Sequence, residues 1–223
     1  MSVLKSAGRA LTIAAMVWGA VSALAAVFLW IWLRERYGRG GPIPPSQAFM
    51  LLNPQRARLH PPGELLRTFR VGAGKTVLEL GPGPGYFSVE ASRLVGPGGR
   101  VVCVDVQPGM ISILRGRLES ERAANAHPVI GDGVRLPLAD HCIDAAYLVT
   151  VLGEIPDRPR ALSELRRVLK PGGVLSIMET LTDTDYQLEA SVRDLCAAYG
   201  FSAIELKRQR LGYTLCFAAP ASA

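Results

Sequence analysis

The chain contains few cysteines, few histidines and few aromatic residues. Four Cys and three His occur in 223 residues, and no two cysteines form a Cys-x-x-Cys pair. This excludes a small disulfide-stabilised scaffold, and because no ligand spacing typical of zinc is present, we expect no bound metal. Aromatic residues make up 7% of the chain. Since no basic stripe of the kind that binds single strands is interleaved with them, we expect no nucleic-acid partner.

Basic residues outnumber acidic ones, with 25 Lys and Arg against 19 Asp and Glu and a formal net charge of +6. Such an excess favours acidic partners, either nucleic acid or an anionic membrane surface. The hydrophobic fraction of 49% is too high for a disordered chain. The length suggests one or two domains.

One long segment near the N-terminus lacks charge altogether, from Leu11 to Leu33. As a helix it would be roughly 34 Å long, enough to cross a hydrocarbon core of about 30 Å. The sequence therefore predicts a tail over 1–10, a transmembrane helix over 11–33 and a juxtamembrane linker over 34–45. A cleaved signal peptide ending near Ala25 and a buried core helix are alternatives. The apolar run continues to Leu33, which favours a retained membrane helix.

Basic residues flank the apolar segment on both sides. Lys5 and Arg9 precede it, whereas Arg34, Arg36 and Arg39 follow it. The larger number on the C-terminal side favours a cytoplasmic location for that side. We therefore expect a single-pass membrane protein whose larger part is cytoplasmic.

Residues 46–220 alternate short β-rich runs with amphipathic segments, which predicts one α/β domain with a mostly parallel sheet covered on both faces. The last two strands are joined by a short connection, so we expect them to be antiparallel. Helices are expected near 87, from Pro108, over 157–170 and over 188–199. The expected strands are Thr76–Leu80, Arg100–Asp105, Pro128–Gly131, Ala145–Thr150, Val174–Glu179, Ser202–Leu206 and Tyr213–Phe217.

A glycine-rich loop, residues 81–86, follows the first expected strand, at the edge where open α/β sheets bind ligands. Asp105 ends the second strand and can accept both hydroxyls of a ribose, and Asp132 follows the third strand and can accept an adenine amine. A plain structural turn is the alternative for the loop and for Asp132. Tyr86 stands where a dinucleotide fingerprint has its third glycine, which favours an adenosyl ligand over a dinucleotide.

Four ordered motifs resemble those of the class I S-adenosylmethionine-dependent methyltransferases. They are Val77–Gly85, Val104–Asp105, Gly131–Pro137 and Glu164–Gly173. The resemblance covers about residues 46–220 and is strongest to the branch that contains the ubiquinone/menaquinone biosynthesis methyltransferases. It implies a Rossmann-like seven-stranded mixed sheet in the order 3-2-1-4-5-7-6 with strand 7 antiparallel. It also implies S-adenosyl-L-methionine as the methyl donor.

The resemblance further implies a cofactor-binding set. Glu79 would fix the glycine loop, and Asp105 would bind the ribose hydroxyls. Asp132 would hold the adenine amine. The remaining members would line the methionine and ribose (Gly81, Pro82, Gly83, Gly85), pack near the adenine (Val106, Met110, Gly133) or border the transferred methyl group (Thr150, Val151).

A general base is required only if the acceptor must lose a proton. Glu154, His60 and Tyr86 are weak candidates, as is Asp183, and each also has a structural explanation. Only about eight residues separate the expected fifth strand from the helix beginning at Leu188. Because this leaves little room for a lid, we expect Pro42–His60 to cover the site and a lipid or quinone-like acceptor to arrive from the membrane.

Other functions remain open from the sequence alone. A protein or nucleic-acid methyltransferase would need a basic or aromatic groove, and Thr150–Ile155 does not match the Asn/Asp-Pro-Pro-Tyr/Phe pattern of amino-group methylation. A non-catalytic membrane-tethered scaffold that keeps the adenosyl pocket is a further alternative. A dehydrogenase is the least favoured, because of Tyr86.

Overall fold

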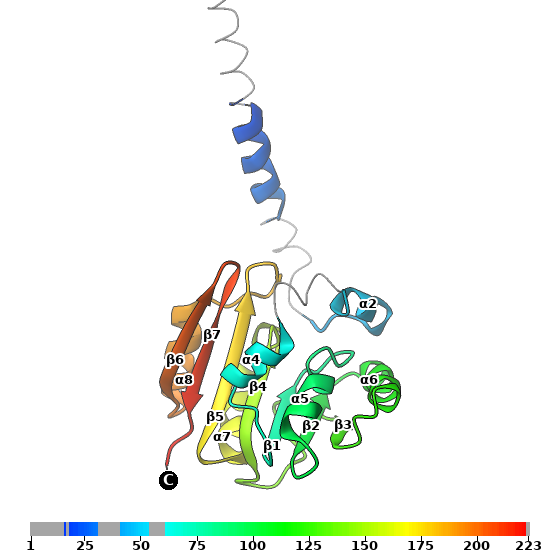
Figure 1. The fold of residues 1–223 in the computed structure, drawn as a ribbon. Helices are drawn as coiled ribbons and strands as arrows, with labels where there is room; N and C mark the ends of the chain where they lie inside the picture. The colour runs from blue at the N-terminus through cyan, green and yellow to red at the C-terminus, as the bar shows by residue number, and fades with distance from the viewer. Residues whose placement is uncertain (1–15, 17, 31–40, 54–60, 222–223) are drawn as a thin grey trace, which may run out of the picture. The chain divides into compact units, whose positions relative to one another are not determined.

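The computed structural model describes residues 16, 18–30, 41–53 and 61–221 of the 223-residue chain. The chain divides into two units, Met1–Arg39 and Gly40–Ala223 (Figure 1). In the first unit, Met16 and residues 18–30 are helical. The other parts of the expected Leu11–Leu33 span lie outside the described residues. Among the helices that the structure describes, none is long and apolar enough to span a membrane.

The second unit is built on a seven-stranded sheet in the order β3-β2-β1-β4-β5-β7-β6. The first five strands of this order are parallel, and β7 is antiparallel to both of its neighbours. This confirms the predicted fold and strand order. The strands are β1 (Thr76–Leu80), β2 (Arg100–Asp105), β3 (Ala126–Ile130), β4 (Ile143–Val149), β5 (Leu169–Thr180), β6 (Ser202–Gln209) and β7 (Gly212–Ala218).

Helices cover both faces of the sheet, because alternate residues of each central strand point to opposite sides. Val77 of β1 packs in one buried cluster with α4 (Pro62–Thr68), α5 (Ser88–Val95) and α6 (Pro108–Ser120). Leu78 packs in the other with α7 (Arg158–Val168) and α8 (Glu189–Ala198). Three short helices complete the described fold: η1 (Pro45–Gln47), α2 (Ala48–Leu51) and η2 (Leu152–Glu154).

Some expected boundaries differ from the structure. The helix expected over 157–170 ends at Val168, and β5 begins at Leu169, before the expected Val174. The β4–β5 pairing shifts register between Ile143 and Ala145, and Gly172 has φ +72°. On α6 the buried residues are Met110, Ile111, Leu114 and Leu118, whereas Ile113 is 37% exposed.

The topology brings the carboxyl ends of β1, β2, β3, β4 and β5 to one edge of the sheet, because these five strands run in the same direction. In Figure 1 this is the upper edge of the second unit, where α2, the loop after β5 and the β6–β7 turn also lie. We call this edge the carboxyl edge.

Candidate active site

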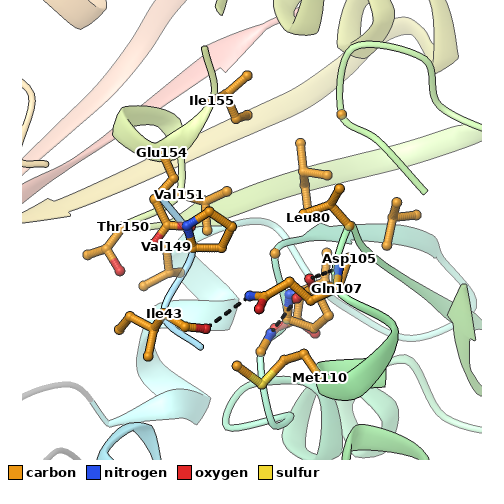
Figure 2. Close-up of a pocket in the computed structure, with 18 of the residues that line it drawn as sticks. Ile43, Leu80, Asp105, Gln107, Met110, Val149, Thr150, Val151, Glu154 and Ile155 are labelled. Atoms are coloured by element: carbon orange, nitrogen blue, oxygen red, sulfur yellow. Dashed lines mark hydrogen bonds between the residues drawn. The ribbon is translucent and has the colours of Figure 1, made fainter. Parts of the chain in front are cut away.

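A cavity of about 400 Å³ opens at the carboxyl edge. Its walls come from the glycine loop after β1, the ends of β2 and β4, η2 and the segment before α2 (Figure 2). Clefts of this size at this edge of an α/β sheet are the usual position of a small-molecule site.

The glycine loop can lie close to the cavity because its backbone adopts conformations that other residues disfavour. Gly81 and Gly83 have φ values of +71° and +55°. A Cβ at Gly81 would overlap the side chain of Val151, and one at Gly83 would lie 3.3 Å from Leu51 Cδ1. Glycine is therefore required at 81 on both steric and conformational grounds.

Asp105 joins the end of β2 to this loop. Its Oδ1 accepts a hydrogen bond from Gln107 N at 2.9 Å, and its Oδ2 accepts one from Gly83 N at 3.3 Å. Burial raises the pKa of Asp105, and the backbone N–H donors oppose that rise. The carboxyl group is thereby held in one orientation beside the cavity that it lines.

Asp132 forms a turn and also lines the cavity. Its Oδ1 accepts a hydrogen bond from Val134 N at 3.0 Å, the arrangement of an Asp-Gly turn. The residue also lines the cavity, as does Gly133, which packs against Leu80. The turn thus holds the carboxylate at the end of β3.

The segment before α2 closes part of the cavity. Pro42, Ile43 and Leu51 contribute to its lining, and Gln107 Nε2 donates a hydrogen bond to Ile43 O at 3.0 Å (Figure 2). The expected cover, Pro42–His60, is therefore present in the part that the structure describes, whereas residues 54–60 lie outside it.

Glu79 is a buried carboxyl group that lines the cavity. Its Oε2 accepts a hydrogen bond from Ser88 Oγ at 2.5 Å, at the first residue of α5. Burial raises the pKa of Glu79 to about 7. This bond fixes the start of α5 relative to β1. It thereby also fixes the C-terminal end of the glycine loop.

Two further carboxyl groups with raised pKa values lie at the ends of β4 and β5. Glu154, in η2, lines the cavity, and burial raises its pKa to about 8, with Asp183 and Asp185 adding to the rise. Burial likewise raises the pKa of Glu179 to about 8. Glu179 Oε2 accepts a hydrogen bond from Gln187 N at 3.4 Å, whereas its Oε1 has no hydrogen-bond partner among the described residues. Both groups therefore hold a proton at neutral pH.

Most of the residues singled out from the sequence meet at this cavity. Eleven of the twelve residues in the expected cofactor-binding set line it, together with Tyr86 and Glu154. Gly85 does not line it. Gly85 has φ +86°, and a Cβ there would lie 2.5 Å from Leu114 Cδ1, so its role is in helix packing. Asp183 is also absent from the lining, and His60 lies outside the described residues.

Sequence reasoning missed several lining residues, including Gln107, Tyr147, Val149 and Ile155. Nothing in the sequence indicates that Gln107 lies at the cavity, because its side chain is held by a hydrogen bond to the backbone carbonyl of Ile43, 64 positions away. Tyr147 pairs with Glu79 across β1 and β4 and stacks on Phe69 at a centroid distance of 5.3 Å. Only the strand register places it at the cavity.

Comparison with known proteins gives concordant results. The family described as "Methyltransferase domain" matches residues 78–177. A ubiquinone/menaquinone biosynthesis C-methyltransferase UbiE of Hahella chejuensis is 34% identical over 137 residues, 61% of this chain and 53% of that protein. An arsenite methyltransferase of Halobacterium salinarum is 32% identical over 138 residues, 60% of this chain and 35% of that protein.

Among solved structures, a SAM-dependent methyltransferase from Aquifex aeolicus superposes with a TM-score of 0.76 at 23% identity, covering 79% of this chain and 99% of that one. The chain spans about half or less of the length of the curated relatives named above. Residues 78–177 match that methyltransferase family, and the chain resembles UbiE in sequence and a SAM-dependent methyltransferase in fold. This confirms the predicted resemblance, and S-adenosylmethionine is the methyl donor that the resemblance implies.

The residues present fit S-adenosylmethionine. The loop at Gly81 and Gly83 lacks the Cβ atoms that would fill the approach to the cavity. Asp105 offers a carboxylate that two backbone N–H groups hold in place, suited to a pair of ribose hydroxyls. Met110, which is 2% exposed, gives this side of the cavity an apolar wall suited to an adenine ring.

We expect Gly81→Ala to destabilise the protein and to abolish binding of S-adenosylhomocysteine. The left-handed conformation at position 81 costs about 1–2 kcal/mol with a Cβ, and the overlap with Val151 adds to this cost. Adding Val151→Ala should remove the overlap and leave the conformational cost. Urea unfolding and calorimetric titration measure both effects.

The control is Gly116→Ala on α6, where a Cβ meets nothing within 4 Å. It should stabilise the helix by up to about 1 kcal/mol. If Gly81→Ala behaved like Gly116→Ala, the constraint assigned to the loop would be wrong.

We expect Glu179→Gln to remove part of a pH dependence of stability. Because the pKa of Glu179 is about 8 in the folded protein and 4.5 for a glutamate exposed to water, its ionisation opposes folding as the pH rises from about 4.5 to 8. The variant should match the wild type near pH 4.5 and exceed its free energy of unfolding at pH 8 by about 4 kcal/mol. Urea unfolding at the two pH values measures this, with the exposed Glu119→Gln as control. If the free energies of unfolding of the wild type and Glu179→Gln changed with pH in the same way, the raised pKa of Glu179 would be wrong.

Proposed function

We propose that the whole chain is an S-adenosylmethionine-dependent methyltransferase, held at a membrane by its N-terminal apolar segment, that methylates a small lipophilic acceptor. The cavity is the observation on which this rests. It joins an adenosyl-type site, made by the glycine loop and Asp105, to an apolar wall made by Val149, Val151 and Ile155.

The methyl donor would be held by residues of the first three strand ends. Asp105 would accept the ribose hydroxyls, Asp132 would accept the adenine amine, and the backbone of Gly81–Gly83 would follow the methionine part. When bound, S-adenosylmethionine supplies a methyl group on a positively charged sulfur, which is already a strong electrophile. The protein's main tasks are therefore to align the acceptor and to exclude water.

An apolar acceptor is favoured by the side chains around the outer part of the cavity. Ile43 lines it from the segment before α2, Leu51 lines it from α2 itself, and Val151 and Ile155 line it from the region after β4. The chain connects this segment to the apolar run 11–33, with only 34–41 between them. A membrane-held acceptor could therefore enter without leaving an apolar environment. We propose that the larger unit lies on the cytoplasmic side, as the arginines at 34, 36 and 39 indicate.

Arsenite, the acceptor named for one relative, has less support. Trivalent arsenic is thiophilic, and no cysteine is present in the lining of the described cavity. Three of the four cysteines are instead buried elsewhere, namely Cys103, Cys196 and Cys216.

Glu154 would act as the general base for an acceptor that must lose a proton. It lines the cavity, and a pKa of about 8 makes its carboxylate a stronger base than an exposed glutamate. Tyr86 also lines the cavity and is the other candidate there.

Calorimetric titration of the full chain in detergent with S-adenosylhomocysteine tests the donor site, with NADH as comparator. We expect binding of the first ligand alone. Asp105→Ala removes a charged acceptor and should weaken binding about 10- to 100-fold. The exposed Asp194→Ala on α8 should bind as the wild type does. Absence of binding to S-adenosylhomocysteine would reject the methyltransferase in favour of a scaffold.

Transfer of a labelled methyl group to a membrane extract tests the acceptor and the base together. Label should appear in the organic phase rather than in protein. If Glu154 is the base, the turnover rate should rise with pH up to about 8, where its carboxylate forms. Glu154→Gln should lower the rate about 10²- to 10⁴-fold and remove this rise, without weakening S-adenosylhomocysteine binding. An unchanged pH profile in the variant would exclude Glu154, and label confined to protein would exclude a lipophilic acceptor.

A further inference from the structure

Exposed apolar side chains concentrate at the carboxyl edge. Among its described residues, the second unit exposes nine large apolar side chains. Only Ile113 and Ile204 lie away from this edge. The other seven follow a strand end or belong to α2 and the β6–β7 turn: Phe49, Met50, Val106, Ile130, Leu181, Leu188 and Leu211. Val106 lines the cavity itself.

Two of these side chains come from neighbouring turns. Leu181 follows β5 and is 54% exposed, and Leu211 stands between β6 and β7 and is 36% exposed. Leu181 N donates a hydrogen bond to Leu211 O at 2.8 Å, so the two turns are joined. Figure 1 shows both turns at the same end of the sheet. They form a paired apolar projection, which we call the leucine tip.

The short helix α2 has an inner and an outer side. Ala48 is buried, and Leu51 lines the cavity, whereas Phe49 and Met50 are 71% and 59% exposed. The same four-residue helix thus contacts the cavity with one side and presents two large apolar side chains with the other.

A lipid bilayer is the partner that best fits this edge. The helix over 18–30 exposes apolar side chains around its circumference, among them Trp18, Leu24 and Phe28, so this chain carries a segment that itself needs an apolar medium. The fourteen residues 31–44 connect it to η1 and can span at most about 50 Å.

The charges at the edge indicate how such a contact would form. The exposed Arg210 adjoins Leu211 in the turn and suits an anionic headgroup. The loop after β5 also carries Asp183 and Asp185. Because the two signs are mixed, insertion of apolar side chains, rather than attraction of opposite charges, would provide most of the binding.

We propose that the carboxyl edge is a membrane-docking surface, on which Phe49 and Met50 on one side and the leucine tip on the other enter the interfacial layer of a bilayer. The cavity mouth between them would then open toward lipid. This inference rests on the membrane anchoring in the proposed function, and it adds a second contact, made by the folded unit itself.

Tryptophan reporters in the full chain test the docking. All three natural tryptophans lie at positions 18, 30 and 32, so changing them to phenylalanine leaves a background without tryptophan. Phe49→Trp, Leu211→Trp and, as control, Glu119→Trp on the exposed side of α6 are then introduced singly. Each protein is reconstituted into phosphatidylcholine–phosphatidylglycerol vesicles with or without bromine on the acyl chains.

We expect the emission of F49W and L211W to shift to the blue and to lose intensity with brominated lipid, and the emission of E119W to do neither. If the chain floats with the vesicles but F49W and L211W behave like E119W, docking is wrong and anchoring stands. If F49W alone is quenched, the segment at α2 touches lipid but the edge does not dock, which also overturns the inference. A chain that does not float with vesicles, yet binds S-adenosylhomocysteine, would reject anchoring and docking while leaving the methyltransferase intact.

Discussion

The bond between Asp105 and the glycine loop is the interaction on which the site depends. Gly83 N and Gln107 N both donate to this one carboxylate, and Gln107 in turn holds the segment at Ile43 through its side chain. The end of β2, the loop after β1 and the cover of the cavity are thereby linked in one chain of hydrogen bonds. Because these elements are distant in sequence, the parallel pairing of β1 with β2 is what allows them to meet.

A second constraint is the burial of carboxyl groups in or near one cavity, which Glu79 and Glu154 line and where Glu179 interacts with Glu154. Glu79, Glu154 and Glu179 all have pKa values well above that of an exposed glutamate, mainly because they are withdrawn from water. Such groups lower the stability of the fold as they ionise. Their concentration beside a ligand cavity is typical of sites that have a chemical role. Glu79, bonded to Ser88, has a structural part in addition.

The alternation of strands and helices could be predicted from hydrophobic periodicity, and the order of the strands from the family resemblance. The bounds of β1 and β2 match the prediction to the residue, since Thr76–Leu80 and Arg100–Asp105 are short apolar runs with clear turn signals. Boundaries near Gly172 and Thr150 were less predictable. Thr150 has φ +55° and donates its backbone N–H to Met178 O, a tertiary contact that ends β4 one residue early.

The sequence by itself determined the chemical types at the site: glycines where a Cβ would clash, and carboxylates at the ends of strands. It also determined the apolar character of residues 11–33. Only the tertiary structure decided which of these residues share a cavity. It removed Gly85 from the lining because Leu114 packs against it, and it added Gln107 and Tyr147. It also collected Phe49, Leu181 and Leu211 at one edge. The physical reason is that the chemical type of a side chain is set at its own position in the sequence. Which side chains lie close together depends on the strand register and the crossover connections, which no short stretch of sequence specifies.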